Sequence, residues 1–548
     1  MDHGREPFEP RDLQLQRLQL IPLDLQRQVG EGVEGRHGGE CRGGPWAPPL
    51  KAVAQLWRCW HFGAGSHELS GEGPHGPPAT LTLVKHDAFG YWLEEAPGVE
   101  LAPELVGSRE VDVVVVGGGY TGMWAAWHLK QLEPEVRVVL LEADRCGHGP
   151  SGRNGGFCNL MWFSLPNMRG RWGDEGALGV ARAAEAAAVG IGEFCEAEGV
   201  DAWYRQGGYM QVSTAEAHDG VWAAALAACR ELGVEGAIEP LTPEQVASRC
   251  ASPAFRGGAF YPRAATVQPA RLALGLRERL RARGVEVFER SPVTRLAGSP
   301  SGVEAHTASG SVRAGRAVLA LGSAAKAAGG PFHNRLSVAS SHIVLTEPVP
   351  DLLEEIGWTG GECITDSRAL IDYFRTTPDG RIAFGWGGGH IALGARSHGR
   401  AELDPEVISQ TAEHLWEYFP GLEGKAITHA WGGPIDASPT HLPIVLPLRG
   451  NRAFAAAGYT GNGVGPSNMV GRSLASLALD RRDAHANLAF VDPSPPRVQP
   501  EPVHWRGGEA IRAGIMRKEE AELADRSPDP ISSLLARVPE LIGFHIGR

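Results

Sequence analysis

Three glycines and one acidic residue have the types and the spacing that bind a dinucleotide. Gly117, Gly119 and Gly122 follow the G-x-G-x-x-G pattern, and Glu142 comes 20 residues after the last of them. In this pattern the first glycine permits a tight turn, the second lets the backbone approach a pyrophosphate, and the third lets a helix pack closely against a strand. A carboxylate at position 142 can accept hydrogen bonds from both hydroxyls of a ribose. These four residues therefore predict a site for the AMP half of a dinucleotide.

A strand, a helix and a second strand must position these residues. Residues 113–116 form an unbroken run of valine, which is typical of a parallel strand that is buried on both faces. Alanine, tryptophan and leucine dominate residues 123–130 and predict a helix, whose first N–H groups can face an anion. Pro134 marks a loop, and residues 136–141 predict the second strand. An ordinary glycine turn is the alternative, but the order of strand, turn, helix, strand and acid favours a dinucleotide-binding βαβ unit.

A small polar loop after Glu142 indicates which dinucleotide binds. Glu142 cannot choose between FAD and NAD, because both carry an adenosine diphosphate with free ribose hydroxyls. FAD is longer, so it also needs hydroxyl and amide groups at its second phosphate and ribityl chain, and glycines where the backbone lies against a flat ring. The loop offers such residues, namely Ser151, Gly152, Arg153, Asn154, Gly155 and Gly156. We therefore predict that this loop binds FAD, with a solvent-exposed loop as the alternative.

Three further segments carry a family resemblance. They are residues 267–296 (VQPARLALGLRERLRARGVEVFERSPVTRL), residues 317–325 (AVLALGSAA) and residues 453–479 (AFAAAGYTGNGVGPSNMVGRSLASLAL). Together with the glycine turn and the polar loop, they resemble the D-amino acid oxidase superfamily of FAD-dependent oxidoreductases, which includes glycine, sarcosine and γ-glutamylputrescine oxidases. The resemblance covers roughly residues 112–480. Its motifs are specific for FAD and for the fold, but not for the substrate.

The resemblance assigns further residues to FAD. It implies that Val293 lies near the adenine, that Gly322 ends the strand that closes the cofactor domain, and that Gly461, Asn462 and Gly463 face the flavin pyrimidine. The last three residues also suit flavin without the family, because they precede a predicted helix. Its N-terminal amides and dipole favour the negative charge that reduced flavin carries near N1 and C2=O. A helix that simply begins with ordinary glycines is the alternative.

The resemblance implies an α/β fold with a discontinuous, Rossmann-like FAD-binding domain and an inserted substrate domain with a mixed sheet, of the α+β type. A length of 548 residues suggests two or three structural units. We predict FAD-binding parts over residues 84–199, 266–330 and 430–480, substrate-domain parts over 200–265 and 331–429, and a C-terminal linker with a helical extension over 481–548. The patterns predict helices over residues 177–198, 403–419 and 508–524, strands over 340–346, 369–375 and 381–386, and two strands around a glycine turn over 203–212.

Residues 1–83 differ in composition from the rest of the chain. A stretch rich in leucine, glutamine and arginine (DLQLQRLQLIPLDLQRQV) precedes sequence rich in glycine, glutamate, arginine and histidine, without a sustained helix or strand pattern. Such a composition predicts disorder. Members of the similar family usually begin near a segment like residues 89–97 (FGYWLEEAP), so a second hypothesis is that translation starts near Val84 through a GTG codon.

Composition and charge argue against several classes of protein. The formal net charge of −12 disfavours nonspecific binding to nucleic acid or to an anionic membrane. The chain has no run of about 18 apolar residues and no secretory signal pattern, so we expect a cytoplasmic protein. Its eight cysteines form no C-x-x-C pair, and no cluster has metal-ligand spacing, which favours free thiols and no metal site. We expect noncovalent FAD, because the residues around Cys363 do not match the motif of relatives that attach flavin through a cysteine.

Candidate catalytic residues lie in or near the predicted strands of the substrate domain. Oxidation of an amine by flavin requires a C–H bond held close to the ring, a deprotonated nitrogen and a site with little water. Tyr373, Arg375 and His342 are the candidates, and His390 is a fourth. Each has a structural alternative: a core tyrosine, a surface arginine, a histidine paired within the sheet, and a histidine bonded to a glycine-loop backbone. Residues 431–433 (WGG) are expected to form a wall of the pocket or a packing turn.

The resemblance implies an enzyme that oxidises the C–N bond of an amine or an N-substituted amino acid by hydride transfer to flavin N5. The polar loop and residues 373–385 (YFRTTPDGRIAFG) are most similar to the γ-glutamylputrescine oxidase branch. The Arg–Tyr pair that holds a substrate carboxylate in amino-acid oxidases is not located in the sequence. We expect oxygen to accept the electrons and give hydrogen peroxide, although a dehydrogenase with another acceptor fits equally. A noncatalytic flavin-binding module and an NAD-dependent dehydrogenase are the alternatives.

Overall fold

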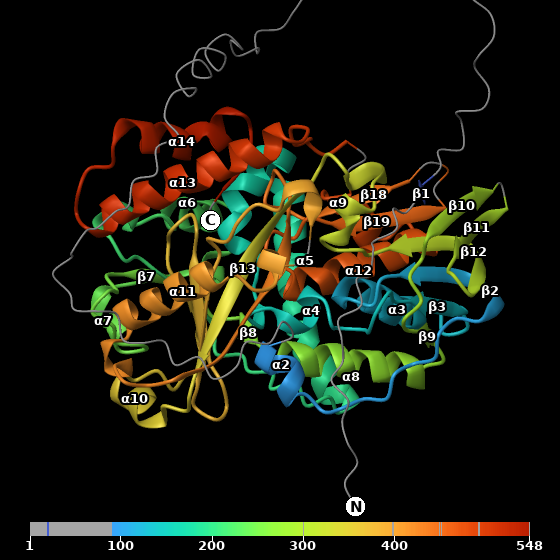
Figure 1. The fold of residues 1–548 in the computed structure, drawn as a ribbon, viewed down its shortest axis with the longest axis horizontal. Coiled ribbons are helices and arrows are strands. Elements are labelled where there is room, and N and C mark those ends of the chain that lie inside the picture. The colour runs from blue at the N-terminus through green and yellow to red at the C-terminus, as the bar shows by residue number, and fades with distance from the viewer. Residues whose placement is uncertain are drawn as a thin grey trace, which may run out of the picture. The chain divides into compact units, whose positions relative to one another are not determined.

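The computed structural model describes residues 19–20, 90–299, 301–396, 399–448, 450, 452–491 and 494–546. The predictions of disorder and of a later translation start concern residues 1–83, which lie outside these ranges except for a two-residue strand, β1 (Gln19–Leu20). Two large sheets and the helices that pack on them make up the described part (Figure 1). Within the described ranges, none of the helices is long and apolar enough to cross a lipid bilayer.

Nine of the described strands form the first sheet. Their spatial order is β1, β10 (Arg295–Ser299), β11 (Gly302–His306), β12 (Gly310–Leu319), β2 (Gly107–Val116), β3 (Val138–Leu141) and β9 (Glu286–Phe288), and β19 (Ala453–Ala457) pairs with both β12 and β18 (Ile444–Pro447). The strands β9, β3, β2, β12 and β19 run parallel to one another.

The predicted valine strand is confirmed as the C-terminal end of β2. Val113 and Val115 pack in one hydrophobic cluster, whereas Val114 and Val116 pack in another. Successive side chains of a strand point to opposite faces, so this strand is buried on both sides. The βαβ unit is completed by α3 (Tyr120–Leu132) and by β3, which begins two residues later than predicted.

Three more helices pack beside the first sheet: α5 (Leu165–Glu198), α8 (Pro269–Ala282) and α12 (Val464–Ala478). The predicted helix over residues 177–198 is confirmed as the C-terminal part of α5, which ends at Gly199 with a φ of 62°. At Gly471, α12 approaches α3 so closely that a Cβ would lie 2.7 Å from the Cβ of Trp124. Their buried side chains share one cluster with Val113 and Val115, so α3 and α12 are rigidly placed on the same face of the sheet.

Eight of the described strands form the second sheet. Their spatial order is β17 (Ile427–Ala437), β13 (Ser337–Thr346), β16 (Ile382–Trp386), β15 (Asp372–Thr376), β14 (Cys363–Thr365), β5 (Tyr209–Val212), β7 (Gly258–Tyr261) and β6 (Glu239–Leu241). The strands predicted over residues 340–346, 369–375 and 381–386 are confirmed as β13, β15 and β16. The strand β15 begins only at residue 372, because the preceding turn is closed by hydrogen bonds between Asp366 and Asp372.

Helix α11 (Pro405–Tyr418) covers one face of the second sheet and confirms the helix predicted over residues 403–419. It begins after Asp404, whose side chain accepts a hydrogen bond from the N–H of Glu406. Its apolar residues share a cluster with Val344 and Phe374 of the sheet. The other face of the sheet is therefore the one available to the residues of the cofactor loops.

The expectation of two strands over residues 203–212 is wrong for the first of them. Only β5 joins the sheet, and residues 203–208 lie outside it. Trp203 has a φ of 51°, which turns the chain, and Arg205 makes an isolated bridge with Thr266 instead. Gly207 packs against the backbone of Gly361, where a Cβ would lie 2.3 Å from the carbonyl oxygen. Tertiary contacts therefore decide the path of this segment.

The mixed α/β fold class is confirmed. Strands of the first sheet come from residues 107–141, 286–319 and 444–457 besides β1, and strands of the second sheet come from residues 209–261 and 337–437. The two sheets thus alternate along the chain. The domain boundaries stay a prediction.

The described part also contains shorter helices and one short strand pair. They are α2 (Gly90–Glu95), α4 (Pro150–Arg153), α6 (Ala223–Glu231), α7 (Pro243–Ala247), α9 (Ala324–Ala327), α10 (Pro350–Glu355), and the antiparallel pair β4 (Phe157–Cys158) and β8 (Ala265–Thr266).

Two C-terminal helices, α13 (Val503–Leu523) and α14 (Pro530–Leu541), lie side by side (Figure 1). The helix predicted over residues 508–524 is confirmed as most of α13, whereas α14 was not predicted. Three side chains of α13 bond to loops of the second sheet. Glu509 accepts from the N–H of Ile391, Arg512 donates to the carbonyl of Gly388, and Glu519 accepts from the N–H of Ala369. The C-terminal helix α13 therefore anchors the loop before β15 and the loop after β16.

Candidate functional site

The residues predicted to bind FAD gather at the carboxyl ends of four parallel strands. Gly117 directly follows β2, Glu142 directly follows β3, Gly322 comes shortly after β12, and Gly461 comes shortly after β19. These strands pair in parallel, so their carboxyl ends meet at one edge of the sheet. Ligands of open parallel sheets bind at this edge.

The glycine turn leaves no room for side chains. Gly117 has a φ of 111°, and a Cβ there would lie 2.2 Å from the carbonyl oxygen of Ala320. A Cβ at Gly122 would lie 2.0 Å from the carbonyl oxygen of Gly117. Gly119 precedes α3 and supplies no capping side chain. The N–H of Tyr120 bonds to Ser151, so the next N–H groups of the first turn are the ones that can face an anion. This geometry fits the pyrophosphate of a dinucleotide.

Glu142 lies directly beside the glycine turn. Its Oε2 accepts a hydrogen bond from the N–H of Gly118 at 2.6 Å, and its Oε1 accepts one from the N–H of Asp144 at 2.9 Å. Burial is the main cause that raises the pKa of Glu142, whereas the two N–H groups lower it. The carboxylate is thus held in one orientation at the end of β3, where it can accept from a ribose.

The polar loop is connected to the start of α3. Ser151 Oγ accepts a hydrogen bond from the N–H of Tyr120 at 2.9 Å. Asn154 closes the loop on itself: its amide donates to the carbonyl of Ser151, and its Oδ1 accepts from the N–H of Gly156 at 2.7 Å. Arg153 is buried, and its guanidinium forms an ion pair with Glu402 at 3.4 Å. Ser151, Asn154, Gly155 and Gly156 therefore lie where a ligand on the glycine turn continues.

The glycine loop before α12 lies beside α3 and Asn159. Tyr459 and Thr121 of α3 are joined by a hydrogen bond between their hydroxyls at 2.7 Å. Asn462 lies beside Asn159, with 3.3 Å between the side-chain amides. Gly463 caps α12 without a side-chain hydrogen bond, so its first N–H groups are open. Val293 is buried in the cluster that contains Val116 at the end of β2.

Tyr373 and Arg375 lie against the glycines of the polar loop. Tyr373 Cε2 is 3.0 Å from the point where a Cβ of Gly155 would lie, and Arg375 Nη1 is 2.6 Å from the corresponding point of Gly156. Alternation explains why these two side chains share a face: Phe374 between them packs in the cluster under α11. The structure thus brings two predicted catalytic residues together with two predicted cofactor residues.

Arg375 is a buried cation, with only 3% of its surface exposed. It donates to the backbone carbonyls of Val267 and Thr376, and its guanidinium carbon lies 5.7 Å from the ring of Trp92. Among the described residues, no carboxylate lies within ion-pair distance of it. Burial lowers the pKa of Arg375 to about 10, so it is positively charged at neutral pH. A buried positive charge without a carboxylate partner favours an anionic or polar ligand.

Tyr373 is held between its own sheet and Phe157 of β4. Its hydroxyl lies 2.7 Å from Ser341 Oγ, and its ring meets Phe157 edge-on with 6.0 Å between the centroids. In the sheet register Tyr373 is opposite Gly385, where a Cβ would lie 2.2 Å from Tyr373 Cζ. The missing side chain therefore makes room for the ring. Burial raises the pKa of Tyr373 to about 12, so the phenol is neutral.

The two histidines lie away from Tyr373 and Arg375. His342 shares the strand face of Val344, under α11, and its Nε2 accepts a hydrogen bond from the N–H of Asp404 at 3.0 Å. Burial lowers the pKa of His342 to about 4, so its ring is neutral. His390 bonds to Glu509 of α13. Both side chains thus make structural contacts, but with other partners than the sequence alternatives gave: the side chain of His342 bonds to the backbone before α11 rather than within the sheet, and that of His390 bonds to a glutamate of α13 rather than to a glycine-loop backbone.

Several residues on the face of Tyr373 were missed by the sequence analysis. Gln211, Thr365, Tyr373, Gly385, Ile343 and Trp431 form one row across six strands. Trp431 was predicted as part of a wall, and its indole N–H donates to the carbonyl of Arg153. Gln211 is buried, and its Oε1 lies 3.4 Å from the hydroxyl of Tyr261. The sequence signal that could have pointed to Gln211 is a polar residue within an otherwise apolar strand. Which residues lie beside Gln211, however, depends on the order of the strands in the sheet.

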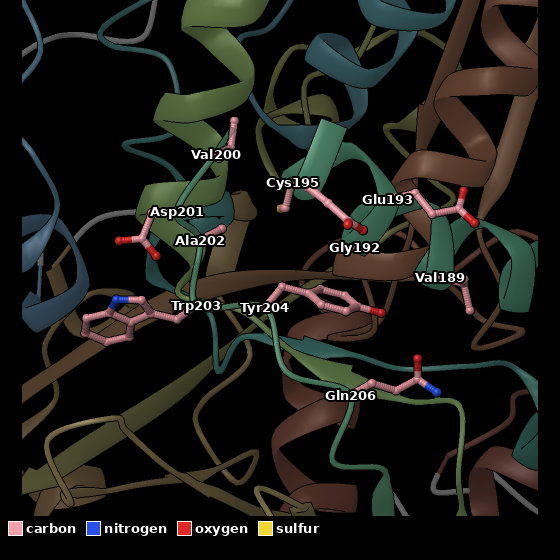
Figure 2. A pocket seen from close by; sticks show the side chains of 11 residues that line it. Val189, Gly192, Glu193, Cys195, Val200, Asp201, Ala202, Trp203, Tyr204 and Gln206 are labelled. Carbon is pink, nitrogen blue, oxygen red and sulfur yellow. The ribbon is translucent and has the colours of Figure 1, made fainter. Parts of the chain in front are cut away.

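Figure 2 shows a separate, open cleft of about 490 Å³ between the C-terminal part of α5 and residues 200–206. Cys195, Asp201, Trp203 and Tyr204 are among its lining residues, and none of the predicted site residues lines it. Burial raises the pKa of Cys195 to about 12, so this thiol is protonated. The six cysteines in the described part are all free and buried, and no group of potential metal ligands occurs there.

Comparisons with known proteins show which proteins this chain resembles. A probable oxidoreductase of Rhizobium meliloti, OrdL, is 27% identical over 420 residues, which cover 72% of this chain and 89% of that protein. The gamma-glutamylputrescine oxidoreductase of Escherichia coli is 29% identical over 392 residues, which cover 69% of this chain and 86% of that protein.

Solved structures share the fold. The glycine oxidase of Geobacillus kaustophilus matches with a TM-score of 0.58 and 20% identity, over 70% of this chain and 99% of that chain. The L-proline dehydrogenase of P. horikoshii matches with a TM-score of 0.58 and 18% identity, over 70% and 97% of the two chains. The family described as FAD dependent oxidoreductase (DAO) matches residues 112–477. The predicted resemblance is thus confirmed, and the chain belongs to the DAO family of FAD-dependent oxidoreductases.

Proposed function

We propose that the protein oxidises the carbon–nitrogen bond of a small amine or an N-substituted amino acid. The observation that carries this proposal is the position of Tyr373 and Arg375 beside Gly155 and Gly156, because it puts a neutral phenol and a buried cation next to the loop proposed to hold flavin. Relatives named gamma-glutamylputrescine oxidoreductase and sarcosine dehydrogenase, and a structural neighbour named glycine oxidase, support this substrate class.

The proposed FAD contacts follow the edge of the first sheet. They are Gly117, Gly119, Gly122, Glu142, Ser151, Arg153, Asn154, Gly155, Gly156, Val293, Gly322, Gly461, Asn462 and Gly463. When bound, FAD supplies the acceptor for the hydride that leaves the carbon next to nitrogen. We propose that it is held noncovalently. Cys363 is fully buried within β14, and its Sγ lies 3.6 Å from the carbonyl of Gly208, which supports a structural thiol.

The side chains of the second sheet provide the conditions for amine oxidation. Ile343, Trp431 and Phe157 make the surroundings of Tyr373 apolar, which excludes water. The positive charge of Arg375 lowers the pKa of a neighbouring ammonium group and so favours the deprotonated amine that reacts. Tyr373 and Arg375 are thus proposed to orient the substrate and to control its protonation. Within the described part of the chain, the side chain of His342 makes a structural hydrogen bond with the backbone of Asp404, which does not support a similar role.

Oxygen is the proposed final electron acceptor, with hydrogen peroxide as the product. The proposed division of labour assigns residues 84–199, 266–330 and 430–480 to FAD and residues 200–265 and 331–429 to the substrate. The alternation of the two sheets along the chain supports this division.

An anaerobic absorbance experiment tests the function. The purified protein is expected to be yellow, and an oxidisable amine from a panel of primary amines, N-methylated amino acids and polyamine conjugates should bleach the flavin band. Admission of oxygen should restore the band and release peroxide. A colourless protein that takes up no FAD would refute the cofactor site. A yellow protein that no amine bleaches would favour a noncatalytic flavin module, and activity that depends on nicotinamide would favour an NAD-dependent dehydrogenase.

A further inference from the structure

Ser341 and Tyr373 form a chain of two hydroxyl groups that ends on a backbone carbonyl. Ser341 Oγ lies 2.8 Å from the carbonyl oxygen of Trp386 and 2.7 Å from the hydroxyl oxygen of Tyr373. A carbonyl oxygen only accepts hydrogen bonds, and a serine hydroxyl has one proton. The proton of Ser341 therefore goes to Trp386, and Ser341 must accept the proton of Tyr373. The reverse direction would leave two oxygen atoms 2.8 Å apart without a proton between them.

This direction determines what the phenol can offer to a ligand. The single proton of Tyr373 is used in the bond to Ser341, so its oxygen can only accept a further hydrogen bond. The phenol does not ionise near neutral pH, because burial raises its pKa to about 12. A group that contacts this oxygen must therefore be a donor. An amine or ammonium N–H meets that condition, whereas a carboxylate does not.

The packing of the ring keeps the phenol in this orientation. Tyr373 is on β15 and Ser341 is on β13, with β16 between them. The ring crosses the intervening strand at Gly385, which has no side chain, and its Cε2 and Cδ2 atoms lie against Gly155. Phe157 contacts the ring edge-on. A rotation that withdrew the hydroxyl from Ser341 would meet one of these neighbours, so the direction of the hydrogen bond is built into the site.

Arg375 requires the opposite kind of hydrogen-bond partner, namely an acceptor. It lies two residues along the same strand face, and its guanidinium offers only donors. Side chains two residues apart on one strand face are separated by roughly 7 Å. This face of the sheet therefore offers a hydrogen-bond acceptor at Tyr373 and donors at Arg375, and one small molecule is long enough to reach both.

We propose that Ser341 is a positioning residue that makes Tyr373 a hydrogen-bond acceptor, and that the site thereby selects ligands whose amine N–H meets the phenol oxygen. The proposal rests on the proposed function, since it names the recognition of the amine at the same site. It predicts that a carboxylate, where a ligand has one, is not bound by Tyr373.

Two probes of the same shape but opposite hydrogen-bond character test this proposal. tert-Butylamine is a donor and cannot be oxidised, because the carbon next to its nitrogen has no hydrogen; pivalate carries a carboxylate in place of the amine. Both are titrated into the yellow holoenzyme, and binding is read from the shift of the flavin band. The wild-type protein should bind tert-butylamine through the phenol oxygen, whereas pivalate can bind only through the donors of Arg375. Tyr373→Phe should weaken the amine by up to about tenfold, as expected for the loss of one hydrogen bond, and leave pivalate unchanged.

Substitutions of Ser341 test the direction of the hydrogen bond. Ser341→Ala frees the phenol proton, which can then be donated to a carboxylate. The ratio of the two dissociation constants should therefore change at least fivefold in favour of pivalate binding. Ser341→Thr retains a hydroxyl and should restore the ratio. In the Tyr373→Phe background, Ser341→Ala should change nothing further, because there is no phenol to orient. This dependence separates a positioning role from general damage to the site.

Specific outcomes would overturn the inference. These are a yellow wild-type protein that binds no amine, a Tyr373→Phe variant that weakens pivalate or affects neither probe, and a Ser341→Ala variant with the wild-type ratio. The Tyr373→Phe comparison remains decisive where Ser341→Ala does not fold. A colourless protein, or a yellow one that no amine bleaches, would instead refute the proposed function, so the flavin colour and the anaerobic bleaching assay together distinguish the two failures.

Discussion

Replacing Glu519 by glutamine is expected to stabilise the protein above neutral pH. Glu519 lies on α13, is only 6% exposed, and accepts a hydrogen bond from the backbone N–H of Ala369. Burial is the main cause that raises its pKa to about 7, although the positive charge of Arg368 acts in the opposite direction. Glutamine has the same size and retains an oxygen for Ala369, but it carries no charge. The substitution therefore removes the cost of ionising a buried carboxyl group and little else.

The sign and the size of the effect follow from proton linkage. The pKa of Glu519 rises from an ordinary 4.5 to about 7 in the folded protein, so the folded state binds the proton more tightly than the unfolded state. The resulting stability is fully present below pH 4.5 and is lost as the pH rises through 7. At about 1.4 kcal/mol for each pH unit, the loss amounts to about 3 kcal/mol above pH 8. The charged neighbours of Glu519 that remain in the variant are Arg368 and Asp366, and Asp372 with its partner His414 lies beside Arg368.

Urea unfolding of the holoenzyme at pH 5 and at pH 8 measures this effect. The free energy of unfolding of Glu519→Gln should lie within about 1 kcal/mol of the wild type at pH 5 and exceed it by about 3 kcal/mol at pH 8. Glu520→Gln removes the same charge from the next residue of α13, which is exposed, and should match the wild type at both pH values. An equal difference at both pH values, or a variant that is less stable at pH 8, would refute the reasoning.

Three further substitutions test the cofactor turn, a buried ion pair and the ring of the site. Gly122→Ala should abolish FAD binding, measured by the flavin absorbance of the purified protein, because its Cβ would lie 2.0 Å from a backbone oxygen of the turn. Arg277→Met should lower the free energy of unfolding by about 3 kcal/mol in urea, because it leaves the buried carboxylate of Glu289 without its cation at 2.8 Å. Gly385→Ala should displace the ring of Tyr373 and lower kcat at least tenfold in stopped-flow bleaching while FAD stays bound.

Each of these substitutions has a matched control. Gly149→Ala, near the same turn, adds a Cβ with no atom within 4 Å and should retain FAD. Arg281→Met removes an exposed cation of the same helix, paired with Glu278 at 3.4 Å, and should leave stability nearly unchanged. Gly387→Ala adds a Cβ 3.5 Å from its nearest neighbour and should keep its kcat. A control that equals its test variant in any of the three comparisons would contradict the corresponding explanation.

Patterns within a few residues allowed much of the fold to be predicted. The valine run of β2, the three glycines and the acid after β3 lie in one continuous stretch, so their spacing alone indicated a dinucleotide site. Helix α11 was predicted from its apolar spacing, and its capping residue Asp404 comes immediately before it. The first strand expected before β5 failed because Arg205 bonds to Thr266, which is distant in sequence. Local preference is overridden where distant backbone supplies the hydrogen bonds.

The sequence by itself determined where the cofactor site begins, at the glycine turn and the acid that lie at one edge of the first sheet. This was possible because the requirements of the glycine turn are steric and involve only residues close together in the sequence. It also named Tyr373, Arg375 and His342 as candidates, but it could not tell which of them share a surface. That depends on which face of the second sheet α11 covers and on the order of strands that are distant in sequence. The tertiary structure put Tyr373 and Arg375 on the side of Gly155 and Gly156, put His342 on the other side, and brought Ser341 within hydrogen-bond distance of the phenol across a neighbouring strand. Side chains alternate between the two faces along a strand. The face that α11 covers therefore determines which half of the residues in the second sheet can face the site.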